Sequence, residues 1–239
     1  MKDVITHQPI SQQQLAANIA AVRSAIAAAA QRAGRDPATI TLIAVSKTKP
    51  VELVAMAHRL GVTDFGENRV QEALPKISAF HPPDVRWHMI GRLQSNKAGK
   101  VAEAFDWVQS IDSLHLARTL DQQAAKQAKR LLVLLEVNVA GEESKAGLAP
   151  ADLPALARQI AELPNLAIQG LMTVAPLVAD PEQVRPVFRA LRELRDHMRD
   201  ELPQCSWQQL SMGKTDDYSV AIEEGATIVR IGRAIFGER

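Results

Sequence analysis

Apolar and polar positions along the chain follow two periods, one helical and one typical of strands. Near the start, four apolar residues fall at helical spacing on one face: Leu15, Ile19, Val22 and Ile26. Ser11 with Gln14 three positions later predicts a capping box, and Gly34 predicts the end of the helix. A helix is therefore expected before the first strand.

Eight short apolar segments then predict β-strands. They cover residues 42–47, 63–67, 86–90, 107–111, 131–139, 167–173, 209–213 and 227–232. Several are nearly continuous apolar runs, as expected in a parallel sheet that is covered on both faces.

Helical patterns separate these strands. They cover residues 51–60, 70–80, 96–105, 113–129, 152–163, 184–199 and 217–224. Pro186 predicts a late start or a kink in the sixth of them. The alternation predicts an α/β fold, a single (β/α)₈ TIM barrel over residues 1–239 with an extra N-terminal helix. An open doubly wound sheet is the alternative, but its glycine fingerprint is absent after the first strand.

Composition narrows the class of protein. The 239 residues carry 28 Lys and Arg against 27 Asp and Glu, so a net charge of +1 predicts no general attraction to nucleic acid or membranes. The single cysteine, Cys205, excludes an intramolecular disulfide, which fits a reducing compartment. The sequence shows no Cys/His cluster with metal-ligand spacing, no signal peptide and no membrane span. We expect a soluble, cytoplasmic protein without a metal site.

Lys47 is the first candidate site residue. Active sites of such barrels lie at the carboxyl ends of the strands. Ile43, Val45 and Lys47 share one side of the first strand, so Lys47 is predicted to reach the barrel mouth. An apolar pocket or neighbouring cations such as Lys49 would lower the pKa of this amine and prepare it for Schiff-base formation. The alternative is a solvated surface charge, which is the commoner fate of a lysine at a strand end.

Arg230 is the second candidate, because it lies inside the apolar run 228–231 on the same parity as Ile228. A guanidinium drawn into a barrel needs an acceptor. Two interpretations stay open: a buried pair with Glu136 or Glu67, and a contact with a ligand.

The last two strands end in residues suited to an anion. Backbone N–H groups and hydroxyls are offered there by Ser211, Met212, Gly213, Thr215 and Gly232. Asn68, His88 and Asn138 also fall near strand ends, where each is more often a polar core residue than a ligand contact. Asn68 and His88 are still kept as candidate contacts for the ligand. Together with Lys47, the anion seat predicts a phosphorylated aldehyde bound as a Schiff base.

Seven segments carry a family resemblance. They are AVSKTKP (44–50), FGENRVQE (65–72), WHMIGRLQSNK (87–97), GLMT (170–173), SMG (211–213), VRIG (229–232) and AIFG (234–237). In this order they closely resemble the pyridoxal 5′-phosphate (PLP) homeostasis proteins, over nearly the whole chain. The resemblance implies a barrel like the N-terminal domain of bacterial alanine racemase.

The resemblance also implies roles for individual residues. Lys47 would hold PLP as a Schiff base, Arg230 would lie at the pyridine ring, and Lys145 matches a family lysine implicated in handling the cofactor. The phosphate would lie at Ser211, Gly213 and Gly232.

Two positions depart from the family pattern. Lys214 and Thr215 replace a common Met-Ser pair, and Arg233 stands where a small hydroxyl residue is common. Both changes add positive charge beside the anion seat. We therefore expect phosphate binding to survive, with Arg233 as a contact and with stronger salt dependence.

The expected function is transport and regulation of PLP. An always-charged guanidinium such as Arg230 keeps the pyridine nitrogen unprotonated, so carbanion stabilisation should be weak. The single tyrosine, Tyr218, is badly placed to oppose Lys47 as a second acid or base. We expect a monomeric PLP carrier in vitamin B6 and amino-acid homeostasis, with PLP-dependent apoenzymes as recipients. The alternatives are a weak PLP-dependent racemase or another Schiff-base enzyme, and a scaffold for another protein.

Overall fold

Eight parallel strands close into a barrel in chain order, from β1 to β8 and back to β1. This computed structural model describes residues 10–142 and 146–238. The strands are β1 (Thr41–Val45), β2 (Asp64–Glu67), β3 (Arg86–Met89), β4 (Trp107–Ile111), β5 (Leu131–Glu136), β6 (Leu166–Met172), β7 (Gln209–Ser211) and β8 (Ile228–Ile231). The predicted TIM barrel is confirmed.

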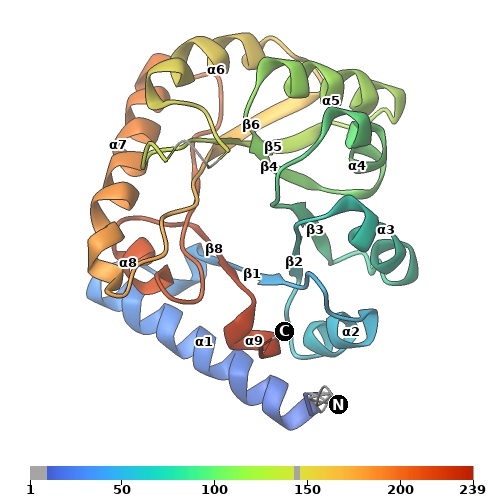
Figure 1. Ribbon diagram of the computed structural model, residues 1–239, viewed down its shortest axis with the longest axis vertical. Coiled ribbons are helices and arrows are strands. Elements are labelled where there is room, and N and C mark those ends of the chain that lie inside the picture. The colour runs from blue at the N-terminus through green and yellow to red at the C-terminus, as the bar shows by residue number, and fades with distance from the viewer. Residues whose placement is uncertain (1–9, 143–145, 239) are drawn as a thin grey trace, which may run out of the picture.

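Helices form a ring around the strands (Figure 1). They are α1 (Gln12–Arg32), α2 (Val51–Arg59), α3 (Val70–Ala79), α4 (Ala98–Ala104), α5 (Leu114–Lys126), α6 (Leu153–Ala161), α7 (Arg185–Glu201), α8 (Tyr218–Glu223) and α9 (Arg233–Phe236). Short 3₁₀ turns are η1 (Pro37–Thr39), η2 (Ser95–Lys97), η3 (Pro150–Asp152) and η4 (Pro181–Val184). Pro186 lies in the first turn of α7, so the late start is confirmed and no interior hydrogen bond is lost.

The extra N-terminal helix α1 runs past α8 and α9 in Figure 1. Ser11 caps it by accepting a hydrogen bond from the Gln14 N–H at 3.1 Å. The Gln14 side chain turns to Asn18 at 2.8 Å instead of completing the predicted capping box. Asn18 then donates to the Ile235 carbonyl at 2.9 Å, which ties α1 to the last helix.

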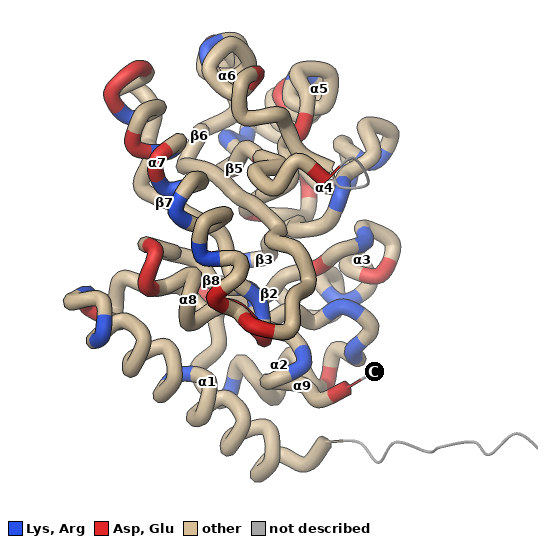
Figure 2. The backbone as a smooth tube through the Cα atoms, turned by 60° about the vertical axis from the view of Figure 1, so that its left-hand side comes forward, with Lys and Arg blue, Asp and Glu red and all other residues tan. Residues whose placement is uncertain are grey.

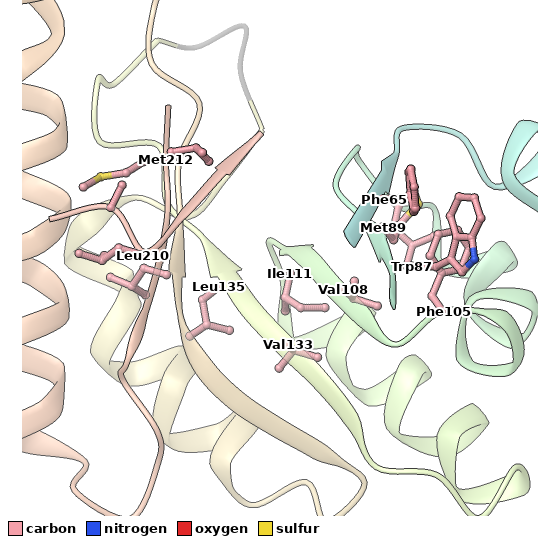
Figure 3. Close-up of a cluster of buried hydrophobic side chains, with 14 of the residues drawn as sticks. Phe65, Trp87, Met89, Phe105, Val108, Ile111, Val133, Leu135, Leu210 and Met212 are labelled. Carbon is pink, nitrogen blue, oxygen red and sulfur yellow. The ribbon is translucent and has the colours of Figure 1, made fainter. Parts of the chain in front are cut away.

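Apolar side chains pack in two layers. The larger layer lies between the strands and the helices, where Figure 3 shows Phe65, Trp87 and Phe105 at one end and Leu210 and Met212 at the other. A small second cluster gathers Ile43, Trp107, Leu134, Met172 and Ile228 from five different strands. Successive side chains along these strands point alternately into the two layers. This explains why the apolar runs in the sequence are nearly continuous.

Charges of both signs are spread over the surface, and they alternate along α7 in Figure 2. Arg185 on this helix pairs with Glu223 at the end of α8 at 2.7 Å, and Arg189 pairs with Glu224, which directly follows α8, at 3.0 Å. Within the described ranges, no helix combines the length and apolar character that a membrane crossing requires.

Candidate functional site

The barrel mouth brings Lys47 close to the ends of β2 and β8. Strand β1 ends at Val45, so Lys47 lies in the following turn and is not the strand residue that was predicted. Ala44 pairs with Ile231 and Val45 pairs with Gly66, so the segments that follow these three strands are neighbours. A turn therefore places the half-buried Lys47 at the mouth. The alternation of side chains along β1 does not decide its direction.

Buried polar contacts hold this turn. Ser46 Oγ donates to Glu67 Oε1 at 2.7 Å, and Lys76 Nζ donates both to Glu67 Oε1 and to the Ser46 carbonyl, each at 2.7 Å. Glu67 is fully buried. Thr48 has a φ of 63°, a left-handed conformation that strains a β-branched residue. Strain held by neighbouring contacts indicates that the position of Lys47 is tightly determined.

Lys49 has a structural contact close to this turn. Its Nζ donates to the Phe236 carbonyl at 3.1 Å and to the Glu238 carbonyl at 2.9 Å. These contacts attach residues 236–238 to the turn after β1, and the predicted effect of Lys49 on the pKa of Lys47 stays a prediction.

A chain of hydrogen bonds crosses the barrel interior. Arg230 donates to Ser211 Oγ, and Ser211 donates to Gln109 Oε1 at 2.7 Å. Gln109 Nε2 lies 3.1 Å from His88 Nδ1, and His88 Nε2 lies 2.9 Å from Asp64 Oδ1. All five side chains are buried. Branched apolar side chains usually fill this part of a TIM barrel, so the polar chain is a special feature of this one.

The direction of these bonds gives the charge states. Because Gln109 Oε1 accepts from Ser211, the Gln109 amide N–H donates to His88 Nδ1, and the His88 proton lies on Nε2. Burial lowers the pKa of His88 despite the neighbouring Asp64, so the ring is neutral. Burial alone would raise the pKa of Asp64, but hydrogen bonds from His88 and Arg86 hold it below its usual value.

Three predicted ligand contacts need correction. His88 uses both ring nitrogens inside the protein and stacks on Trp107, with ring centroids 5.6 Å apart, so it does not face a ligand. The Ser211 hydroxyl is taken up by Gln109 and Arg230. The Met212 side chain packs in the layer under the helices, and its backbone N–H donates to the Ile228 carbonyl at 3.1 Å. Sequence parity could not reveal these partners, because they come from distant strands.

Arg230 combines features of both interpretations. Its second hydrogen bond goes to the Thr173 carbonyl at 2.8 Å, so Ser211 and Thr173 accept from it instead of a glutamate. Burial lowers the pKa of Arg230 to about 10, and attraction to Glu136 opposes the shift. The guanidinium therefore stays charged at neutral pH. Burial raises the pKa of Glu136 to about 7 against the opposing attraction of Arg230.

The raised pKa of Glu136 predicts a pH-dependent stability. Its carboxyl binds a proton more tightly in the folded state, so its stabilising contribution is complete below pH 4.5 and is lost as pH rises to about 7. A shift of this size corresponds to about 3 kcal/mol. Urea unfolding at pH 5 and pH 8 should show this loss in the native protein, and Glu136→Gln should remove it. The exposed Glu103→Gln is the control, and equal pH dependence in both variants would refute the assignment.

Replacing Gln109, which lies in the middle of the interior chain of hydrogen bonds, is expected to destabilise the protein. Gln109→Leu leaves His88 Nδ1 without a donor and the proton of the Ser211 hydroxyl without an acceptor, and each buried unsatisfied group costs about 1–3 kcal/mol. We expect urea unfolding to show a loss of about 2–4 kcal/mol. Gln122→Leu, on the exposed side of α5, should change stability by less than about 0.5 kcal/mol. Similar losses in the two variants would show that the chain contributes little.

The predicted anion seat is built from close-packed loops after β7 and β8. Gly213 has a φ of 94°, and a Cβ there would lie 2.7 Å from Ala221 Cβ and 2.8 Å from Tyr218 Cα. Gly232 lies against β1, where an added Cβ would be 3.4 Å from Val45 Cβ. Gly213 therefore lets the loop after β7 pack closely on α8, and Gly232 lets the loop after β8 pack closely on β1.

The two extra cations beside this seat already have partners. Arg233 pairs with Asp216 and lies 3.7 Å from Glu238. Lys214 Nζ donates to the Ala175 carbonyl at 3.2 Å. Nearby acidic groups therefore offset the added charge of Arg233, which reduces the expected increase in salt dependence.

The remaining candidates lie in several places. Thr215 is half-buried in the turn before α8, and Asn138 donates to the Glu142 carbonyl at 2.8 Å. Asn68 follows β2 at the mouth, and its Oδ1 is buried without a hydrogen-bond partner. The prediction for Lys145 lies outside the described residues. No cluster of metal-ligating side chains occurs in the part of the chain that the structure describes.

The fold and the site define a class: a (β/α)₈ barrel protein that presents a lysine amine at its mouth beside glycine-bearing loops suited to an anion. The profile of the family described as alanine racemase, N-terminal domain, matches residues 10–239. The chain belongs to this family.

Relatives of nearly the same length are named pyridoxal phosphate homeostasis proteins. The one from Pseudomonas aeruginosa is 49% identical over 225 residues, covering 94% of this chain and 96% of the relative. The one from Escherichia coli K12 is 43% identical over 228 residues, covering 94% and 97%. These identities extend over the barrel as a whole.

Solved structures show the same fold. PipY from Synechococcus elongatus PCC7942, solved with PLP bound, is 38% identical with a TM-score of 0.84, covering 94% of this chain and all of PipY. An alanine racemase from Clostridium difficile 630 is 14% identical with a TM-score of 0.72, and 60% of it is covered. At that identity the second likeness concerns the fold alone.

Proposed function

We propose that this chain binds PLP and acts in vitamin B6 homeostasis as a carrier. The observation that carries the proposal is the turn of Lys47 at the barrel mouth, beside the loops that follow β2 and β8. PLP supplies an aldehyde that an unprotonated lysine amine captures as a Schiff base, and Lys47 is the residue proposed for this bond. The names of the homeostasis proteins and the PLP-bound PipY support the choice of ligand.

The residues at the mouth fit such a ligand. Asn68 Oδ1 and Glu67 Oε2 are buried beside the Lys47 turn without hydrogen-bond partners, and buried polar atoms usually have one. Gly213 and Gly232 would admit the phosphate to the backbone of their loops. Arg230 would meet the ring, held in place by Ser211 and Thr173.

The same residues favour binding over catalysis. A charged Arg230 donates hydrogen bonds and accepts none, so it cannot draw electrons into the ring by protonating it. Burial raises the pKa of Tyr218, which disfavours that phenol as a proton acceptor. We propose a monomeric carrier without substantial catalysis, with PLP-dependent apoenzymes as recipients.

Borohydride reduction of the PLP-treated protein, followed by peptide mass spectrometry, tests the proposal. A pyridoxyl group on the Lys47 peptide is expected, because reduction makes the Schiff base permanent. No adduct would defeat the proposal, and an adduct on Lys214 or Lys76 alone would move the site. Chiral analysis of alanine incubated with the protein should show no racemisation above that of Lys47→Ala.

A further inference from the structure

A hollow opens at the mouth, beside the ends of β2, β3 and β4. It is a groove of about 690 Å³ that begins at Asn68 and ends at Leu116. Pockets for small molecules usually have volumes of about 300–1,000 Å³. Most of the groove is built by residues 68–71 and 92–97, which belong to two of the family segments. Of these residues, the proposed PLP site uses only Asn68.

Cationic groups border this groove. Arg92 makes no hydrogen bond within the described residues, and its Nε lies 3.9 Å from Asp112. Lys97 has no ion pair in the same part of the chain. Arg69 bonds Glu72 at 3.0 Å through one nitrogen only, and 75% of its side chain is exposed. Donors therefore remain for an anion.

Four apolar side chains lie beneath the surface of the groove. Val70, Met89, Leu93 and Leu116 line it, and each is nearly fully buried. A small ligand with an anionic group would match a mixed lining that carries these cationic groups.

The groove adjoins the interior of the barrel. Arg92 and Asp112 both act electrostatically on Glu136, which lies at the end of β5 inside the barrel. Asn68 lines the groove and directly follows Glu67, which binds the Ser46 hydroxyl beside Lys47. A ligand in the groove would therefore lie next to the proposed PLP site.

We propose that this groove is a second ligand site, which binds a small anion carrying a carboxylate or a phosphate group. Arg69 and Arg92 contact the anionic group. The site goes beyond the proposed function and does not require a bond between Lys47 and PLP.

The test is isothermal titration calorimetry of PLP-loaded, desalted protein at low salt, with inorganic phosphate and succinate titrated separately. PLP loading fills the seat at Gly213, so added phosphate reports on the groove. Saturable binding of either anion is expected, and Arg69→Gln with Arg92→Gln should weaken it at least tenfold. Phosphate binding alone identifies a phosphate ligand, and succinate binding identifies a carboxylate ligand.

A matched pair, Arg59→Gln with Arg118→Gln, removes two exposed arginines outside the groove and should leave the affinity unchanged. Equal melting temperatures of the two double variants would exclude misfolding as the cause. Absence of saturable binding, or equal affinity in both double variants, would overturn the inference. If PLP does not load, the same titrations on the purified protein still test the groove, because the loss depends on Arg69 and Arg92.

Discussion

Replacing Lys47 by alanine is expected to abolish covalent retention of PLP. The proposed bond needs an amine at the turn after β1, and alanine supplies none. After borohydride reduction and denaturation, the native protein should retain the pyridoxyl group, whereas Lys47→Ala should retain none. The change is all-or-none, which makes it the largest effect expected here.

Lys100→Ala is a control for this experiment, because Lys100 is exposed on α4. It should retain as much pyridoxyl group as the native protein. Thermal unfolding of Lys47→Ala should stay close to native, since Ser46, Glu67 and Lys76 hold the turn without the Lys47 side chain. Undiminished labelling of Lys47→Ala would show that another amine captures the aldehyde.

Replacing Gly213 by alanine is expected to damage both stability and PLP retention. Its φ of 94° disfavours any side chain, and the new Cβ would lie 2.7 Å from Ala221 Cβ. Left-handed strain of about 1–2 kcal/mol together with overpacking of about 1–3 kcal/mol predicts a loss of about 2–5 kcal/mol in urea unfolding. Relief of the clash must move the loop after β7, so PLP affinity should fall at least tenfold in a fluorescence titration.

Gly34→Ala separates backbone strain from overpacking. Gly34 has a φ of 64°, and a Cβ there would meet nothing within 4 Å. It should cost about 1 kcal/mol through backbone strain alone and leave PLP affinity unchanged. If Gly213→Ala is no worse than Gly34→Ala, the close packing of the anion seat is unimportant.

The strand and helix pattern predicted the barrel, the order of its elements and the lysine at its mouth. Helix α9 was missed because its four residues are too short for a periodic pattern. Strand ends were predicted too long at β1, β5 and β7, since apolar composition continues after the strand hydrogen bonds stop. For this reason strand parity could not place Lys47.

The interior polar chain was not predictable from spacing. His88 and Gln109 are 21 positions apart, and Gln109 and Ser211 are 102 apart. Each of these residues alone is consistent with a ligand contact, and only the neighbouring strands show that its polar atoms are already satisfied. Lys76 was missed for the same reason, because nothing in α3 indicates that its amine supports the turn after β1.

The amino-acid sequence by itself determined that this chain is a (β/α)₈ barrel with an amine and two glycine-bearing loops at one end, because hydrophobic period and the order of elements suffice for that. The tertiary structure alone decided which polar side chains face one another inside the barrel and which remain available to a ligand. The reason is that closure of the barrel pairs groups from strands far apart in the chain, and a hydrogen bond depends on those distances rather than on residue type.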